Sequence, residues 1–114
     1  MQKYHAAKLL RLHFTERDRY RDKPLYEAIV EKCREMKVAG VTVFRGLEGY
    51  GEDAEIHRSH VLRHDLPIVV QVVDSEESIA RLLPVVEDMM DKGLIAISDV
   101  NVIRVQNAEG VHDV

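Results

Sequence analysis

The sequence predicts an α+β domain in which two helices cover one face of a four-stranded antiparallel sheet. Three observations lead to this fold class. The chain has 114 residues, which is the size of a single domain. Short segments with the alternation or the β-branched content of strands flank two longer segments whose apolar residues recur at helical spacing. These elements follow one another in the order βαββαβ, which is the order of a ferredoxin-like sandwich.

The first half of the chain contains a strand, a helix and a second strand. Residues 6–14 alternate in hydrophobicity and predict the first strand, and the polar residues 15–23 predict a loop after it. Pro24 suits the first turn of a helix, where its missing N–H removes no hydrogen bond. The apolar stripe of this helix consists of Leu25, Ala28, Ile29, Cys33 and Met36. Gly40 is expected to stop the helix, and the β-branched residues 41–45 predict the second strand.

The second half repeats the order of elements after a long segment without periodicity, residues 46–66. Residues 68–73 are apolar and β-branched, and they predict the third strand. The final strand is expected within residues 94–105, with an interruption at Ser98 and Asp99 because these residue types are disfavoured in strands.

The second helix lies between these two strands. Asp74 is expected to cap it, with Glu77 three residues later in the position of a capping box. Its apolar stripe consists of Ile79, Leu82, Leu83, Val86 and Met90. Pro84 lies beyond the first turn and is expected to kink the helix, which then ends at Lys92 and Gly93.

The sheet face opposite the helices is also apolar in this prediction. It carries Leu9, Val69, Val73 and Ile103, although a monomer with two helices on one face would expose these residues to water. The chain has no further element to cover them. Self-association through this face is the economical solution.

Composition and charge exclude several classes of protein. Sixteen basic residues against twenty acidic ones give a net charge of −4, which is the wrong sign for a general nucleic-acid binder. The apolar runs are far shorter than the roughly 20 residues that a membrane-spanning helix needs. The single cysteine, Cys33, cannot form an internal disulfide, and no secretory signal opens the chain. A cytoplasmic location is therefore expected.

A glycine-rich segment follows the second predicted strand and contains Arg45, Gly46, Gly49 and Gly51. Glycine lets backbone N–H groups approach an anion closely, and an adjacent arginine can grip phosphate with two hydrogen bonds. The spacing is neither a dinucleotide fingerprint nor a Walker loop. Two other interpretations stay open: the glycines form a flexible hinge, or Arg45 pairs with a nearby carboxylate such as Glu48 and holds the root of the loop.

The long segment 46–66 is expected to be a flexible loop, and residues 106–114 a loose tail. Acidic residues precede basic ones in the loop, which suits an arm that becomes ordered on a partner or ligand. His57, His60 and His64 would share one face of a short helix and could bind a divalent metal. Exposed histidines without a metal are the alternative interpretation.

Basic residues also lie near the last predicted strand. Lys92 and Gly93 form the turn before it, and Arg104 lies further along it. A lysine beside a glycine is equally typical of an ordinary helix C-terminus. The sequence shows no nucleophile with a triad context, and no glycine-rich phosphate cradle follows the first strand as an acylphosphatase-type hydrolase would require. We therefore do not expect an enzyme.

The ordered pattern of residues resembles the family catalogued as Domain of Unknown Function 190. The resemblance covers about residues 7 to 105. The matching positions are 18–20, 23–30, 40–46, 49–51, 56–57, 66–70, 79, 83–84 and 93–95. This family is similar to the PII signalling proteins, which implies a ferredoxin-like protomer, a homotrimer, and a loop after the second strand that reports ligand state to a partner protein.

The resemblance further implies a binding site for a small anionic effector, with an adenine nucleotide as the candidate, in clefts between subunits. Carried over by position, the ligand-binding candidates are Arg45, Gly46, Gly49, Gly51, Lys92, Gly93 and Arg104. The implied partner is a membrane transporter or an enzyme. The alternative function is a metal-binding protein of the same trimeric architecture, similar to the divalent-cation tolerance proteins, which would use the three loop histidines.

Overall fold

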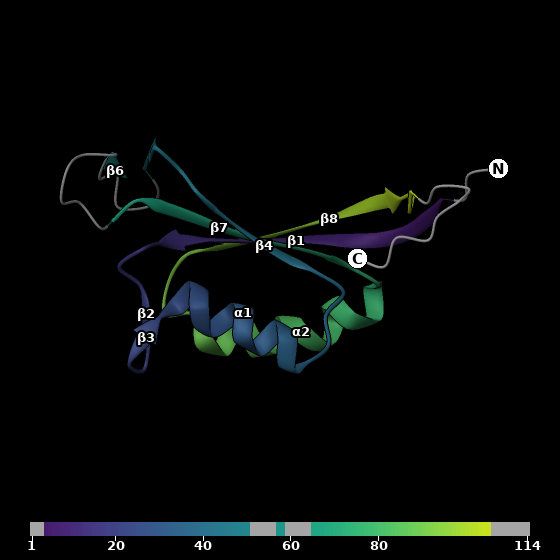
Figure 1. Ribbon diagram of the computed structural model, residues 1–114, viewed down its shortest axis with the longest axis horizontal. Helices are drawn as coiled ribbons and strands as arrows, with labels where there is room; N and C mark the ends of the chain where they lie inside the picture. The colour runs from purple at the N-terminus through teal and green to yellow at the C-terminus, as the bar shows by residue number, and fades with distance from the viewer. Residues whose placement is uncertain (1–3, 51–56, 59–64, 106–114) are drawn as a thin grey trace.

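The computed structural model describes residues 4–50, 57–58 and 65–105. Four strands form an antiparallel sheet in the order β4-β7-β1-β8. Both helices lie against one face of this sheet (Figure 1). The bounds of these elements are β1 His5–Thr15, α1 Leu25–Glu35, β4 Val41–Arg45, β7 Pro67–Asp74, α2 Glu76–Met89 and β8 Leu94–Val102. The predicted ferredoxin-like fold is confirmed.

The core fills the space between the sheet and the helices. The two central strands contribute Leu10, Leu12, Val70 and Val72, which are completely buried. The helices supply the facing layer, because the predicted stripes occupy the side turned to the sheet. The buried stripe residues are Leu25, Ala28, Ile29, Cys33, Ile79, Leu82 and Val86. Burying one such aliphatic side chain contributes roughly 1.5–3 kcal/mol, so this layer stabilises the fold.

The helix ends differ from the prediction in four ways, the first being that α2 ends at Met89 rather than at Lys92 and Gly93. Pro24 precedes α1 as its cap residue rather than lying in its first turn. Lys37, with φ of 60°, takes the left-handed conformation that ends α1, so Gly40 is not the stop. The cap of α2 is Ser75, whose Oγ accepts a hydrogen bond of 3.1 Å from the backbone N–H of Ser78. Asp74 instead accepts a hydrogen bond of 2.9 Å from the backbone N–H of Ala39.

Strand β8 runs without interruption, so the predicted break at Ser98 and Asp99 is wrong. Both residues pair with β1, where Asp99 lies opposite Lys8. The Lys8 ammonium and the Asp99 carboxylate form an ion pair of 2.5 Å, and this hydrogen bond raises the pKa of Lys8. Pairing with a central strand therefore outweighs the weak strand preference of aspartate. The strand ends at Val102, earlier than expected.

Two short hairpins lie in segments that the sequence predicts to be loops. Strands β2 (Arg19–Tyr20) and β3 (Lys23–Pro24) pair before α1, and β5 (Glu48–Gly49) pairs with β6 (His57–Arg58). The expected flexibility of loop 46–66 concerns mainly residues 51–56 and 59–64, which lie outside the described residues. The expected loose tail, 106–114, also lies outside them.

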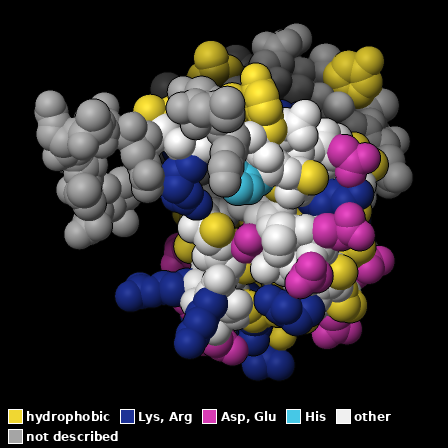
Figure 2. Space-filling view, turned by 90° about the vertical axis from the view of Figure 1, so that its right-hand side faces the viewer, with side chains coloured by type: hydrophobic (Ala, Val, Ile, Leu, Met, Phe, Trp, Pro, Cys, Tyr) yellow, Lys and Arg dark blue, Asp and Glu magenta, His cyan; other side chains and the backbone are white. Residues whose placement is uncertain are grey.

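No described element covers the sheet face opposite the helices (Figure 1). Register places Phe44, Val69, His13 and Leu94 side by side across this face. Phe44 and Leu94 are exposed large hydrophobic residues. Charged side chains of both signs gather instead over the helix layer, in the lower part of Figure 2. The face therefore carries exposed apolar residues as the sequence predicted, but its next row is polar, with Thr42, Gln71 and Arg11 side by side. Ile103 lies beyond the end of β8.

Among the described residues, neither helix combines the length and the apolar character that crossing a bilayer requires.

Candidate functional site

Arg45 and Gly93 lie at the same end of the sheet, but Arg45 lies at one edge and Gly93 at the opposite edge. Arg45 pairs with Ile68, and Ile68 pairs with Phe14. Gly93 immediately precedes Leu94, which pairs with the neighbouring His13. Three strand spacings of about 4.8 Å therefore separate Arg45 from Gly93, or about 14 Å. A single chain does not bring these two groups together.

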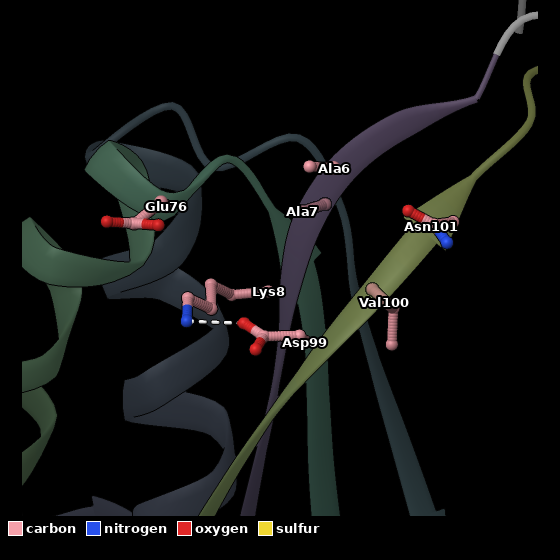
Figure 3. Close-up of a pocket in the computed structure, with 7 residues that line it drawn as sticks. All are labelled: Ala6, Ala7, Lys8, Glu76, Asp99, Val100 and Asn101. Carbon is pink, nitrogen blue, oxygen red and sulfur yellow. Dashed lines mark hydrogen bonds and ion pairs between the residues drawn. The ribbon is translucent and has the colours of Figure 1, made fainter.

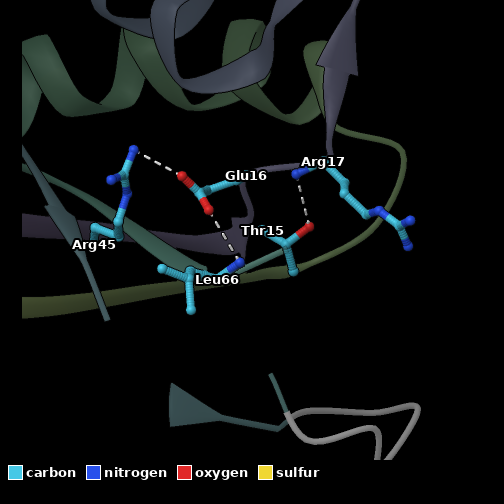
Figure 4. A network of polar contacts seen from close by, with 5 residues as sticks. All are labelled: Thr15, Glu16, Arg17, Arg45 and Leu66. Carbon is cyan, nitrogen blue, oxygen red and sulfur yellow. Dashed lines mark hydrogen bonds and ion pairs between the residues drawn. The ribbon is translucent and has the colours of Figure 1, made fainter. Parts of the chain in front are cut away.

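Arg45 forms an ion pair at the edge strand β4. Its Nη2 lies 2.7 Å from Oε1 of Glu16 (Figure 4). The Arg45 side chain is 59% exposed, whereas the Glu16 side chain is only 11% exposed. Arg45 therefore pairs with a carboxylate, as one sequence interpretation expected, but the carboxylate is Glu16. The guanidinium still reaches solvent, where it could contact an anion.

The sequence did not identify Glu16, because its partners, Arg45 and Leu66, are distant from it along the chain. Its second oxygen, Oε2, accepts a hydrogen bond of 3.2 Å from the backbone N–H of Leu66. Its own N–H donates to the Leu66 carbonyl at 2.9 Å. No local pattern in the sequence identifies the residues that meet here, since the meeting depends on the register of β1, β4 and β7.

Gly46 uses its backbone within the fold. Its N–H donates to the carbonyl of Pro67 at 2.8 Å, so this donor is not available to a ligand. A Cβ at this position would lie 3.3 Å from the Pro67 ring, which is tighter than an ordinary van der Waals contact. Gly49 pairs with His57 in the short hairpin, and Gly51 lies outside the described residues.

The turn before β8 is built on Gly93. Its φ of +127° belongs to a region that side chains rarely adopt, and a Cβ would lie 2.4 Å from the His13 carbonyl oxygen. Lys92 is exposed in this turn. The turn therefore requires glycine for its geometry and presents a cation to solvent.

Arg104 lies at the other end of the sheet. The nine residues of β8 and Ile103 separate it from Gly93, and β8 alone spans about 30 Å as an extended strand. It follows the end of β8, so the expectation that Arg104 lies on a strand is wrong. Arg45, Lys92 and Arg104 therefore occupy three separate places on the chain.

The alternative metal site lies mostly outside the described residues. His57 belongs to β6, but His60 and His64 are not described. In the part of the chain that the structure describes, no three histidine, cysteine or acidic side chains gather in a way that could hold a metal ion.

The candidate residues line neither of two surface hollows that the described residues form. One, of about 240 Å³, lies where β1 and β8 pass the start of α2, and it contains the Lys8–Asp99 ion pair and Glu76 (Figure 3). The other, of about 440 Å³, lies between Tyr20 and the exposed side of α2 at Pro84 and Val85. Neither of these two hollows therefore assembles the predicted ligand site.

The fold of the chain is similar to that of solved PII-like proteins. The nitrogen-regulatory PII-like protein CPII from Thiomonas intermedia K12, solved with ADP, AMP and bicarbonate, superposes with a TM-score of 0.67 at 21% identity, covering 90% of this chain and 92% of CPII. A candidate PII-like signaling protein from Thermus thermophilus gives 0.61 at 20% identity, covering 90% and 93%. At such identities the likeness concerns the fold.

The chain belongs to the DUF190 family, described as "Uncharacterized ACR, COG1993", whose model matches residues 7–102. A UPF0166 protein of Aquifex aeolicus is 41% identical over 98 residues, which cover 84% of this chain and 92% of the relative. UPF0166 protein MJ1524 of Methanocaldococcus jannaschii is 32% identical over 108 residues, covering 90% and 97%. The family membership expected from the sequence is confirmed.

Proposed function

We propose that this protein is a non-enzymatic, PII-like regulator of the cytoplasm that binds an adenine nucleotide in clefts between the subunits of a homotrimer. One observation carries the proposal. The basic candidate residues lie at separate edges and ends of the protomer, beside an uncovered apolar sheet face. Packing of copies through that face would bring the edges of different sheets together, so that one subunit completes the site of another.

The open sheet face is the observation that favours a trimer. Water would otherwise contact Phe44 and Leu94, together with the half-buried Leu9, Val69 and Val73. Burial of apolar surface contributes roughly 25 cal/mol per Å², which favours association of such faces. A closed ring of three copies covers every open face at once.

The exposed cations are the observation that favours an anionic effector. The Arg45 guanidinium is held at one side by Glu16 and reaches solvent, and Lys92 is exposed in its turn. Arginine and lysine are the residues that bind phosphate groups in proteins. Because CPII was solved with ADP and AMP, an adenine nucleotide is the effector to test first.

The loop 46–66 leaves the sheet directly after Arg45, which suits transmission of ligand state to a partner protein. We propose a membrane transporter or an enzyme as that partner. In this arrangement, binding of the effector changes the conformation of the loop, and the partner protein responds to that conformation.

A thermal-shift panel with adenine nucleotides, cyclic nucleotides and divalent metals tests this function. Ligand at 100 times its dissociation constant stabilises the folded state by about 2.7 kcal/mol, which raises the melting temperature by several degrees. We expect such a rise with ADP or a related nucleotide. A rise with metals alone would favour the loop histidines and the metal-binding alternative, and no rise with any nucleotide would contradict the proposal.

A further inference from the structure

We propose that Glu16 couples anion binding at Arg45 to the start of β7. An anion that draws Arg45 away from Glu16 also breaks the hydrogen bond between Glu16 and the backbone N–H of Leu66. This inference deepens the proposed function and rests on it for the identity of the anion. The coupling itself concerns only contacts within the chain. Glu16 is not among the residues that the sequence or the family resemblance singled out.

The geometry makes Glu16 a bridge between two strand ends. One carboxylate oxygen lies 2.7 Å from Nη2 of Arg45, the last residue of β4. The other oxygen accepts a hydrogen bond of 3.2 Å from the N–H of Leu66, which immediately precedes β7. The segment that connects β4 to β7 therefore has its beginning and its end attached to one side chain (Figure 4).

The turn that carries Glu16 is itself well fixed. The Asp18 carboxylate accepts a hydrogen bond of 2.8 Å from the N–H of Thr15, and the Asp18 carbonyl accepts one of 2.8 Å from the N–H of Leu25 at the start of α1. The Thr15 hydroxyl also accepts a hydrogen bond of 3.3 Å from the N–H of Arg17. Glu16 therefore projects from a rigid base, and a change at Arg45 is more easily absorbed by its side chain than by its backbone.

This ion pair differs from the other ion pairs among the described residues. The carboxylates of Asp99, Glu31 and Glu35 are largely exposed, so water can replace their lysine partners. Glu16 is 11% exposed and has little water to replace Arg45. Loss of the cation would leave a nearly buried carboxylate with one neutral N–H donor, which is an unfavourable state for a charge.

Competition for the guanidinium provides the link. A phosphate that approaches the exposed side of Arg45 is attracted by the guanidinium and repelled by the Glu16 carboxylate. When the phosphate draws Arg45 away, Glu16 gains by turning towards water, and this turn breaks its hydrogen bond to Leu66. By thermodynamic reciprocity, any contact that holds Leu66 in place then weakens binding of the anion.

The first experiment needs no ligand. Backbone amide exchange followed by NMR on the full chain reports the opening of the Leu66 N–H. In Arg45→Met, which removes the cation and keeps an apolar stem, we expect Leu66 to exchange about tenfold faster, because the loss of a charge-assisted hydrogen bond has an effect of this order. Arg45→Lys, which keeps a cation, should stay closer to the parent.

Lys23→Met is the matched control. It removes the cation of the exposed Lys23–Glu31 pair, whose Nζ–Oε1 distance is 2.6 Å, and it should leave Leu66 exchange unchanged. Equal Leu66 exchange in Arg45→Met and the parent would overturn the coupling. Faster exchange in Arg45→Met, but not in Lys23→Met, would support it.

The second experiment adds ADP as the probe. In the parent, ADP should accelerate Leu66 exchange. In Glu16→Gln, which removes the repelling charge and keeps an acceptor, ADP should bind severalfold more tightly without further change at Leu66, whereas Glu31→Gln should behave as the parent. Weaker ADP binding in Glu16→Gln would overturn the competition. If ADP binds none of these proteins while Arg45→Met still releases Leu66, the coupling stands and the nucleotide of the proposed function is wrong.

Discussion

At the scale of single residues, Gly93 shows how a backbone requirement fixes one corner of the candidate site. Its φ of +127° and the 2.4 Å that would separate a Cβ from the His13 carbonyl oxygen exclude other residues. Gly93→Ala should lower the free energy of unfolding by about 2 kcal/mol or more, because backbone strain and steric overlap add. Urea denaturation measures this loss.

Gly40→Ala is the control for that substitution. A Cβ at Gly40 would meet no atom within 4 Å, and the backbone there has no positive φ. Its effect on unfolding should therefore be small, or slightly stabilising because alanine restricts the unfolded chain. Equal losses in the two variants would contradict the account of Gly93.

Cys33 predicts a dependence of stability on alkaline pH. Burial raises the pKa of its thiol from the ordinary value of 9.0 to about 11. Between pH 9 and pH 11 the unfolded chain loses this proton while the folded protein keeps it, so stability is complete below pH 9 and falls above it. Two pH units correspond to about 2 to 3 kcal/mol.

The comparison with Cys33→Ala isolates this effect, since other groups titrate equally in both proteins. The variant should be less stable at neutral pH, because it leaves a cavity, but its stability should fall less steeply between pH 9 and pH 11. Parallel stability curves for the two proteins over this range would show that the thiol titrates normally in the folded state.

At the scale of elements, α2 continues through Pro84 as one helix of 14 residues. Proline in a helix interior lacks the N–H that would bond to the preceding turn, and this costs about 3 kcal/mol relative to alanine in an exposed helix. Pro84 is exposed and contributes little to the core. Pro84→Ala should therefore raise the melting temperature by several degrees.

The exposed Glu87→Ala substitution in the same helix serves as the control and should change the melting temperature little. A lower melting temperature for Pro84→Ala would show that the proline ring makes contacts worth more than the missing hydrogen bond.

The elements also show what the sequence can predict. The helix stripes and the strands were recognisable because burial on one side leaves a periodic pattern, as at Ile29 and Leu82. The continuity of β8 was not, because Asp99 is tolerated only through its pairing with Lys8. The β2–β3 hairpin was also missed, since Arg21 takes a φ of 59° at a turn position where glycine is the usual signal.

The candidate site was less accessible to prediction than the fold. The turn at Gly93 before the last strand agrees with the sequence interpretation, and the role of Arg45 in ligand binding stays a prediction. The hydrogen bond from the N–H of Gly46 to Pro67 and the ion pair between Arg45 and Glu16 depend on which strands lie side by side. A short stretch of sequence does not contain that information.

At the scale of the whole molecule, the open sheet face predicts the oligomeric state. Sedimentation equilibrium should give about three times the chain mass of 13.1 kDa. Val69→Asp places a charge in the middle of this face, opposite His13 and Phe44, and should produce a folded monomer because the charge would lose its water on association. Ala80→Asp, at an exposed position of α2, should remain trimeric. A parent protein that stays monomeric at micromolar concentration would contradict the trimer.

Calorimetric titration of the intact protein with ADP tests the proposed nucleotide site directly. We predict one ADP per subunit, and binding about tenfold weaker or more in Arg45→Ala, because a charge-assisted hydrogen bond to phosphate is worth roughly 1.5 to 3 kcal/mol. Arg34→Ala, at an exposed position near the end of α1, should bind as the parent does. Absence of binding by the parent, or equal affinity in Arg45→Ala, would contradict the proposed site.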